Sequence, residues 1–271
     1  MNGWRRFIPH PSALIPLLVL ACAQPQEKPP AIRRVVSLAP NVTEMLFALG
    51  CGPKVVGTDT FSDYPEGVNR LPRVGGVEPN IEKIVSLHPD LVIASASNAH
   101  PNLRRALEAA HLTLMVIATD HLSQVETSMR DIGRALGCPN PPRVAEALEK
   151  QRHKRAKSPT ILFAVWTNPL YVAGSGSFVD DLFMLTGARN AVSAPGWPQY
   201  SFESFAAHPP DLLLYPSRSV KREAVDELLR RAHVHVDAVA VDENLFTRPG
   251  PRMPAAASEL NRILDQWEKS H

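Results

Sequence analysis

The 271-residue sequence lacks the features that mark several large classes of protein. It has no uninterrupted apolar run of the roughly 20 residues that a membrane-spanning helix needs. Its 29 basic and 27 acidic residues leave no clear charge excess for binding nucleic acid. Gly-x-Ser-x-Gly, P-loop and helix-opening Gly-x-Gly-x-x-Gly motifs are also missing. We therefore predict no permanent transmembrane helix, no nucleic-acid partner and no enzymatic activity.

Cysteine is scarce, with three residues in the chain. The first of them, Cys22, follows a pair of arginines and a short apolar run, Leu14–Ala21, in the order typical of an export signal. The end of this run and Cys22 resemble the lipobox of bacterial lipoproteins, in which the cysteine is acylated. We expect a signal peptide over residues 1–21 and a lipid-anchored tether over residues 22–32, on the periplasmic or cell-surface face of a membrane. Ordinary signal cleavage near Ala21 is the alternative.

Cys51 and Cys138 are the two cysteines that remain after Cys22. An exported protein meets oxidising conditions, in which two thiols form a disulfide when their positions allow it. Two separate buried thiols agree with the sequence equally well, because the spacing of the cysteines does not decide their distance in space.

Short β-branched runs alternate with longer helical stretches from residue 33 onward. This order predicts an α/β protein with parallel sheets covered by helices. We expect an N-terminal lobe over residues 33–121, a helical connector over residues 122–157 and a C-terminal lobe over residues 158–271. The connector is expected to contain two helices, Leu122–Leu136 and Arg143–Lys157, because good helix formers fill both and three prolines separate them.

Two pairs of segments resemble each other in the same order along the chain. Glu82–Ser95 and Glu203–Ser217 each hold a glutamate, a His-Pro pair, an aspartate eight residues after the glutamate, and an apolar strand. Val42–Gly50 and Val179–Gly187 each read as an amphipathic helix ended by glycine. The pairs predict two duplicated lobes with a ligand cleft between them. The plainer alternative is that helix, turn and strand units look alike in any α/β protein.

Several longer motifs occur in one consistent order over roughly residues 33–265. They are Val35–Glu44, Ser62–Pro65, Asn80–Ile84, Gly196–Gln199 and Arg248–Arg252. Together they resemble the substrate-binding proteins of ABC importers that belong to the helical-backbone metal-receptor family, and most of all its cobalamin-binding members.

The resemblance implies an architecture and an activity. The architecture is two Rossmann-like lobes joined by a long backbone helix, as in class III substrate-binding proteins. The activity is capture of cobalamin or a related corrinoid between the lobes and its delivery to an ABC permease dimer, with haem or a ferric siderophore as the alternative ligand. The chain would act as a monomer, and the corrinoid or haem would be cargo, with no resident cofactor.

The resemblance also implies ligand contacts. The six positions are Tyr64, Gly76, Tyr171, Trp197, Asn244 and Arg248. Aromatic rings offer flat faces to a macrocycle, an amide side chain can hydrogen-bond one, and an arginine can hold a carboxylate or phosphate. Without the resemblance, Tyr64 would read as a turn residue before a proline and Trp197 as a core residue. The sequence departs from the cobalamin pattern at Gly75–Val77, where an aromatic wall is missing, and at Asn244, which stands in place of an acid.

Glu82 and Glu203 match the two glutamates with which members of this family dock onto transporter arginines, and the internal repeat reaches the same two residues independently. One carboxylate on each lobe suits a two-fold symmetric partner. A plainer interpretation is that each acid stabilises the first turn of its helix. We predict no protein metal site, because among ten histidines only His233 and His235 are spaced as neighbours on one strand face.

Overall fold

The computed structural model describes residues 31–138 and 141–271, and residues 31–271 form one compact unit. The predicted signal peptide and Cys22 lie outside the described residues. The first lobe contains a parallel sheet with the strand order β2-β1-β3-β4. Its elements are β1 (Val35–Ser37), α1 (Pro40–Ala48), β2 (Val55–Thr58), α2 (Ile81–Ser86), β3 (Leu91–Ser95), α3 (Pro101–Ala109) and β4 (Leu114–Ile117), with short 3-10 helices at Gly52–Lys54 and Glu66–Arg70.

The second lobe repeats this plan with one addition. Its parallel strands have the order β7-β5-β8-β9, and β6 adds an antiparallel hairpin to the far end of β5. Its elements are β5 (Thr160–Thr167), β6 (Leu170–Val172), α6 (Phe178–Leu185), β7 (Arg189–Asn190), α7 (Phe202–Ala207), β8 (Leu212–Pro216), α8 (Arg222–Ala232), β9 (Asp237–Val241), α9 (Glu243–Phe246) and α10 (Met253–Ser270). The predicted class, α/β with two lobes built on parallel sheets, is confirmed.

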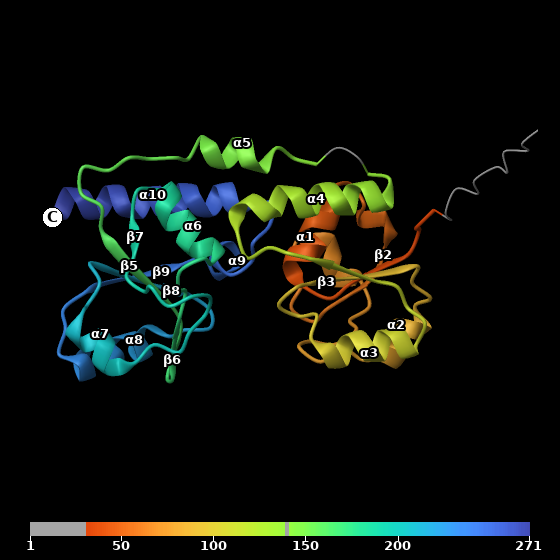
Figure 1. The fold of residues 1–271 in the computed structure, drawn as a ribbon, viewed down its shortest axis with the longest axis horizontal. Coiled ribbons are helices and arrows are strands. Elements are labelled where there is room, and N and C mark those ends of the chain that lie inside the picture. The colour runs from red at the N-terminus through yellow and green to blue at the C-terminus, as the bar shows by residue number, and fades with distance from the viewer. Residues whose placement is uncertain (1–30, 139–140) are drawn as a thin grey trace, which may run out of the picture. The chain divides into compact units, whose positions relative to one another are not determined.

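Both faces of the central strands are buried, and successive residues of one strand belong to different hydrophobic clusters. Val35 packs in the cluster that holds residues of α1 and of the helix α4 (Leu122–Leu136). The next residue, Val36, packs in the cluster that holds residues of α2 and α3. In the second lobe, Ile161 and Leu162 divide in the same way. Figure 1 shows α4 and α10 on one side of the sheets and α2, α3, α7 and α8 on the other. Burial on both faces explains why the strands are nearly continuous apolar runs.

The two lobes share one of the three hydrophobic clusters. It contains residues of α1 and α4 from the first lobe together with residues of α6 and α10 from the second, such as Leu46, Met129, Phe183 and Leu260. The other two clusters each belong to a single lobe. Because a large shared apolar core restrains relative movement of domains, this arrangement favours small movements between the lobes.

Two helices connect the lobes in sequence. α4 (Leu122–Leu136) lies where it was predicted, and Gly137 ends it with a left-handed backbone conformation (φ 71°). α5 (Val144–Glu149) is much shorter than predicted, so the expected helix over Arg143–Lys157 is wrong after Glu149. The reason is tertiary: Arg155 turns inward and is wholly buried against α6 and α10, a position that continued helix would not supply.

The internal repeat corresponds to equivalent structures in the two lobes. Asp90 lies just before β3, and its carboxylate accepts hydrogen bonds from the backbone N–H groups of Arg33 and Arg34 at 2.7 and 2.9 Å. Asp211 lies just before β8, and its carboxylate accepts from the backbone N–H and the hydroxyl of Thr160, both at 2.7 Å. Each aspartate therefore holds the start of the neighbouring central strand, β1 or β5.

A disulfide joins Cys51 to Cys138 in the first lobe, with the two Cα atoms 6.2 Å apart. This decides between the two states that the sequence left open. Cys51 directly follows Gly50, which ends the α1 region with a φ of 74°, and Cys138 follows α4. Within residues 31–138 and 141–271, no helix combines the length and apolar character needed to cross a membrane.

Candidate functional site

A pocket of about 690 Å³ lies at the carboxyl ends of the strands of both sheets. Its lining includes a residue from the segment after each strand of the first lobe, namely Pro40, Phe61, Ser97 and Thr119. It also includes residues that follow the β5–β6 hairpin and the strands β7, β8 and β9 of the second lobe, namely Phe178, Trp197, Arg218 and Glu243. The two lobes therefore contribute to the pocket in the same way.

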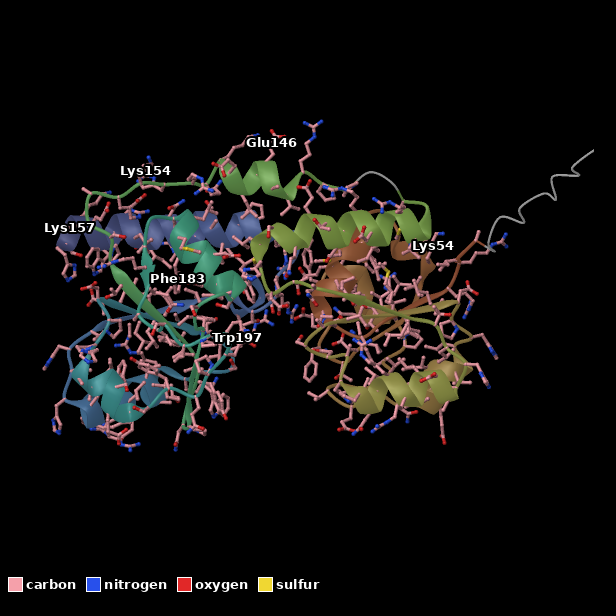
Figure 2. All side chains as sticks on the ribbon, in the orientation of Figure 1. Lys54, Glu146, Lys154, Lys157, Phe183 and Trp197 are labelled. Carbon is pink, nitrogen blue, oxygen red and sulfur yellow. A yellow bond between two sulfur atoms is a disulfide. The ribbon has the colours of Figure 1, made fainter. Side chains whose placement is uncertain are left out.

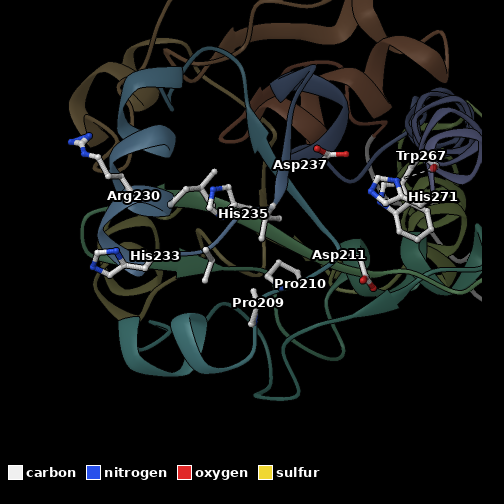
Figure 3. A pocket seen from close by; sticks show the side chains of 12 residues that line it. Pro209, Pro210, Asp211, Arg230, His233, His235, Asp237, Trp267 and His271 are labelled. Carbon is white, nitrogen blue, oxygen red and sulfur yellow. Dashed lines mark hydrogen bonds between the residues drawn. The ribbon is translucent and has the colours of Figure 1, made fainter.

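A second and larger pocket, of about 970 Å³, lies at the opposite end of the C-terminal sheet. Figure 3 shows its lining, with Asp211 and Asp237 at the amino ends of β8 and β9, and with Trp267 and His271 on α10 and at the chain end. In open parallel α/β sheets, ligands bind in the crevice outside the carboxyl ends of the strands. The smaller pocket between the lobes is therefore the candidate functional site.

Aromatic rings enter the pocket from both lobes. Trp197 comes from the C-terminal lobe, where Figure 2 labels it, and its ring packs against that of Phe178 with 5.7 Å between the centroids. Phe61 comes from the N-terminal lobe and is more than half exposed. A flat apolar ligand between the lobes would meet a ring from each of them.

Gly76 makes room for the Phe61 ring. A Cβ atom at position 76 would lie 3.0 Å from both Phe61 Cε2 and Thr60 Oγ1, which is too close for a larger side chain without displacement. The sequence suggested that an aromatic wall is missing at Gly75–Val77. In the structure, Phe61 supplies an aromatic face beside this segment, and the neighbouring Val77 lines the pocket.

A buried carboxylate on α1 holds two arginines of the C-terminal lobe. The side chain of Glu44 is 1% exposed. Arg252 donates to it from Nε and Nη2 at 2.8 and 2.5 Å, and Arg248 Nη1 lies 3.5 Å from Glu44 Oε1. Burial raises the pKa of Glu44, while hydrogen bonds and charge from Arg252 and Arg248 oppose that rise. The contact joins positions about 200 residues apart and fixes Arg248 at the edge of the pocket.

Asp63 extends this ionic cluster across the pocket. Its two carboxylate oxygens accept hydrogen bonds from Arg248 Nη1 at 2.5 Å and Arg218 Nη1 at 3.2 Å. Partial desolvation acts to raise the pKa of Asp63, but these two guanidinium groups outweigh it and lower the pKa. Arg248 also donates to the backbone oxygen of Phe61 at 3.1 Å. Guanidinium groups from the C-terminal lobe thus meet carboxylate and carbonyl groups of the N-terminal lobe.

Small polar side chains complete the floor of the pocket on the N-terminal side. Asn41 donates to Thr119 Oγ1 at 3.2 Å and to the carbonyl oxygen of Pro249 at 3.3 Å. The hydroxyls of Ser95 and Ser97 lie 2.8 Å apart, and Asn98 is held by a bond to a backbone carbonyl. Amide and hydroxyl groups of this kind both donate and accept hydrogen bonds, so they suit a ligand rich in amides.

The structure brings some of the predicted contact residues together and leaves others aside. Trp197 and Arg248 line the pocket, and Gly76 lies directly beside the lining residue Val77. Tyr64 follows the lining residue Asp63, and the guanidinium of Arg252 lies 4.3 Å from the centre of its ring. The tyrosine ring therefore carries a cation on one face.

Asn244 and Tyr171 are not part of the lining, although Asn244 follows the lining residue Glu243. Asn244 is buried in α9 between Glu243 and Thr247, and its Oδ1 atom is buried without a hydrogen-bond partner among the described residues. Tyr171 lies on β6, where it is partly exposed and pairs with the segment that follows Trp197. Sequence reasoning missed Phe61, Phe178 and Arg218, although Phe61 stands directly before the Ser62–Pro65 motif.

Glu82 and Glu203 occupy equivalent places on the two lobes. Each is exposed in the first turn of a short helix, Glu82 in α2 and Glu203 in α7. Each helix is capped by the side chain two residues before the glutamate, Asn80 or Ser201. Figure 1 shows α2 and α7 on the same side of the two sheets, opposite α4 and α10.

His233 and His235 do not share a strand face, so that expectation is wrong. His233 ends α8 with a left-handed backbone conformation (φ 54°), and both residues precede β9. A residue at positive φ turns the chain and breaks the two-residue alternation of a strand. Within the described part of the chain, no group of three or more histidine, cysteine, aspartate or glutamate residues is placed to hold a metal ion.

Comparisons with known proteins agree with this geometry. The model of the periplasmic binding protein family matches residues 35–243. An uncharacterised ABC transporter substrate-binding lipoprotein of Bacillus subtilis strain 168 is 31% identical over 252 residues, which cover 84% of this chain and 78% of that protein. A vitamin B12-binding protein of Yersinia pseudotuberculosis is 26% identical over 264 residues, covering 93% of this chain and 92% of that protein. The apo structure of a periplasmic haem-binding protein from Roseiflexus sp. RS-1 superposes with a TM-score of 0.75 at 27% identity, covering 88% of this chain and 99% of that one.

Proposed function

Because the chain belongs to the periplasmic binding protein family, we propose that it captures a corrinoid in the pocket between its lobes. Members of this family bind small ligands for ABC importers and deliver them to a permease. They are exported transport proteins and not enzymes, and membership confirms the prediction that this chain is not an enzyme. The identity of the ligand and the residues that hold it are our proposal.

The chemistry of the pocket lining is the observation that favours a corrinoid. A corrin ring is flat and carries amide side chains around its edge. The pocket pairs aromatic faces from both lobes, Phe61 and Trp197, with amides and hydroxyls such as Asn41, Ser97 and Asn98. The rings match the flat face, and the polar groups match the amide edge. Arg248 and Arg218 add donors for a phosphate or carboxylate of the ligand.

Haem is the second candidate, supported by the similarity to a haem-binding protein of known structure. In proteins, haem iron is held by histidine, cysteine, methionine or tyrosine. Two described residues of these types stand beside the lining in the sequence. Tyr64 follows Asp63, and Arg252 covers its ring. His121 follows Asp120, and its Nδ1 lies 3.3 Å from Asp181. The lining itself consists of aromatic, hydroxyl, amide, charged and small apolar groups. A corrinoid arrives with its cobalt coordinated by its own ring nitrogens, so it depends less on a protein ligand.

Binding measurements separate these candidates. Purified protein would be titrated with cyanocobalamin, cobinamide, haemin and a ferric siderophore while tryptophan fluorescence is recorded. We expect saturable quenching with the corrinoids only, and a loss of about tenfold or more in affinity for Trp197→Ala, because a stacked ring contributes on the order of 1–3 kcal/mol. The matched control is Trp267→Ala, outside the pocket. Saturation by haemin alone would overturn the corrinoid assignment.

Delivery is proposed to use Glu82 and Glu203, one exposed carboxylate on each lobe, against arginines of a two-fold symmetric permease. The chain would act as a monomer, held to the membrane by a lipid on Cys22. Glu82→Ala with Glu203→Ala is expected to abolish uptake in cells and to leave ligand affinity unchanged. Glu223→Ala, an exposed acid in the first turn of α8, is the control. A collapse of ligand affinity in the double variant would contradict the docking role.

A further inference from the structure

A buried carboxylate begins the pocket-lining loop that follows β2. Asp59 is 2% exposed, and its Oδ1 and Oδ2 atoms accept hydrogen bonds from the backbone N–H of Phe61 at 2.7 Å and the hydroxyl of Ser62 at 2.5 Å. Burial raises the pKa of Asp59, and these bonds oppose the rise. The arginines around the pocket pair with Glu44 and Asp63, and among the described residues none forms an ion pair with Asp59. Because burying a carboxylate without a cation is costly, such a group beside a cleft is a candidate functional residue.

A chain of buried hydroxyl groups leads from Asp59 to a second segment of the pocket. Ser62 Oγ lies 2.8 Å from Thr43 Oγ1, which in turn lies 2.8 Å from Ser37 Oγ. The hydroxyls of Thr43 and Ser37 both reach the carbonyl oxygen of Ala39, at 3.2 and 3.1 Å. The chain therefore joins the loop after β2 to the residue before α1, and both of these segments line the pocket.

The chain can serve either protonation state of the carboxyl group. When Asp59 is ionised, Thr43 donates to Ser62 and Ser62 donates to the carboxylate. When Asp59 is neutral, the acid donates to Ser62 and the hydroxyl hydrogens point the other way, ending on the carbonyl of Ala39, because each hydroxyl both donates and accepts. In both states Oδ1 still accepts from the N–H of Phe61. The carboxyl group therefore holds the loop in the same geometry whether or not it is charged.

This loop presents Phe61 to the pocket. The residue is 55% exposed, so packing alone does not fix its ring, and the position of the ring depends on the backbone. Asp59 holds the N–H of Phe61, and Arg248 donates to its carbonyl oxygen at 3.1 Å. Arg73 Nη1 donates to the carbonyl oxygens of Asp59 and Ser62 at 3.0 and 2.5 Å. An aromatic ring on a backbone that is already fixed loses less conformational entropy when it binds.

We propose that Asp59 is a positioning residue for ligand capture, which holds Phe61 in the orientation that contacts the ligand and does not touch the ligand itself. The inference rests on the proposed function, because it takes the pocket between the lobes as the ligand site. The plainer interpretation is that Asp59 only stabilises the lobe. The two differ once the Phe61 ring is removed, since a residue that acts through Phe61 then has no further effect on affinity.

A double-mutant cycle separates these interpretations. The affinity for cyanocobalamin would be measured by isothermal titration calorimetry for Phe61→Ala, Asp59→Ala and the double variant. We expect a loss of about tenfold for Phe61→Ala and about fivefold for Asp59→Ala, with the double variant about as weak as Phe61→Ala alone. Asp59→Asn keeps an acceptor for the N–H of Phe61 and a donor for Ser62, so it should stay within about twofold of the unaltered protein.

Asp211→Ala is the matched control. Asp211 also accepts hydrogen bonds from a backbone N–H and a hydroxyl, but it does so at the amino end of the C-terminal sheet, so its removal should leave affinity unchanged. Thermal unfolding of each variant, measured in parallel, reports whether it is folded. If Asp59→Ala does not fold, Ser62→Ala takes its place in the cycle, with an expected loss of about threefold.

Unchanged affinity in Asp59→Ala, or losses that add in the double variant, would overturn the positioning role and leave the proposed function intact. An Asp59→Asn variant as weak as Asp59→Ala would also overturn it, because the amide keeps both hydrogen bonds. If the unaltered protein bound haemin and not cyanocobalamin, the corrinoid assignment would be wrong, and the same cycle measured with haemin would decide the role of Asp59.

Discussion

The two lobes place an equivalent pair of helices over their sheets and fasten that pair in different ways. In the N-terminal lobe, the segment after α1 is joined to the segment after α4 by the disulfide between Cys51 and Cys138. In the C-terminal lobe, the end of α6 is joined to α10 by the side chain of Arg155. A covalent bond therefore holds the helix pair together in one lobe, and a buried guanidinium group holds it together in the other.

The side chain of Arg155 is fully buried and makes contacts on both sides. Its Nε donates to the carbonyl oxygen of Thr186 at 2.9 Å, and its Nη2 donates to Asn261 Oδ1 at 2.9 Å. Its Nη1 lies 2.8 Å from Asp265 and 3.2 Å from Glu268. Because a buried charge is costly unless it is paired and hydrogen-bonded, each of these partners is needed. The stability of the N-terminal lobe therefore depends on the redox state of Cys51 and Cys138, whereas that of the C-terminal lobe depends on the polar partners of Arg155.

The largest effect is expected from removing the disulfide. Cys51→Ala with Cys138→Ala should lower the free energy of unfolding by about 4 kcal/mol, because the bond closes a loop of 87 residues and restricts the unfolded chain. Urea denaturation of the double variant measures the loss. Reduction of the unaltered protein should give the same midpoint. A double variant as stable as the unaltered protein would show that the disulfide is dispensable to the lobe.

Arg155→Met is expected to cost about 3 kcal/mol, since it leaves buried carbonyl and carboxylate groups without their donor. The matched control is Arg152→Met, because Arg152 is exposed and pairs only with Glu149 among the described residues. That control should change the free energy of unfolding by less than about 0.5 kcal/mol. If the two arginine variants unfolded at the same urea concentration, Arg155 would not fasten α6 to α10.

The glycines that follow α1 and α6, Gly50 and Gly187, test the same difference between the lobes. Gly50 and Gly187 both have positive φ, but a Cβ at Gly50 would meet nothing within 4 Å, whereas at Gly187 it would lie 2.8 Å from the carbonyl oxygen of His153. We expect Gly50→Ala to cost about 1 kcal/mol from backbone strain alone, and Gly187→Ala to cost about 2 kcal/mol or more. Differential scanning calorimetry gives the order. Equal effects would contradict the tighter packing of the C-terminal lobe at this point.

The smallest effect concerns the equivalent aspartates. Backbone hydrogen bonds, from Arg33 and Arg34 to Asp90 and from Thr160 to Asp211, lower the pKa of both carboxyl groups below the ordinary value of 3.8. A carboxyl with a lowered pKa stabilises the fold above its unfolded pKa, and this contribution is lost as the pH falls through the folded pKa. Because both carboxylates are exposed and solvent screens their interactions, Asp90→Asn and Asp211→Asn should each lower the free energy of unfolding by well under about 1 kcal/mol near neutral pH, and progressively less below about pH 4.

Unfolding midpoints measured from pH 3 to pH 7 would check this expectation. Because each aspartate holds the start of one central strand, the two variants should behave alike. A pH-dependent loss in only one of them would show that the two sheets begin differently, and it would break the equivalence of the lobes at this position.

Local patterns in the sequence predicted the parts of this fold that depend on local chemistry. The alternation of strands and helices and the glycine stops at Gly50 and Gly187 act within a few residues of the chain. The repeat containing Asp90 and Asp211 was visible as a repeated motif, although the hydrogen bonds of these aspartates reach more than 50 residues along the chain. The contact of Glu44 with Arg252 joins positions 208 residues apart, and no local pattern in the sequence predicts it. The helix expected up to Lys157 failed for a similar reason, because the burial of Arg155 depends on α6 and α10.

The residues of the candidate site also differ in whether the sequence predicted them. Trp197 and Arg248, which the resemblance implied as ligand contacts, line the pocket. Phe61 and Arg218 were missed, since exposed aromatic and basic residues in loops are common and only the meeting of the two lobes distinguishes them. Tyr171 lies outside the lining, and no local pattern predicted its bridge to Gln199 in the segment that follows Trp197.

The central claim is that one ligand contacts both lobes at the carboxyl ends of their sheets. Hydrogen–deuterium exchange with and without cyanocobalamin tests it most directly. We expect slower exchange, on binding, in residues 60–63 and 95–98 of the N-terminal lobe together with residues 196–199 and 243–248 of the C-terminal lobe. Protection in one lobe alone, or in residues 233–237 at the larger pocket, would contradict the account.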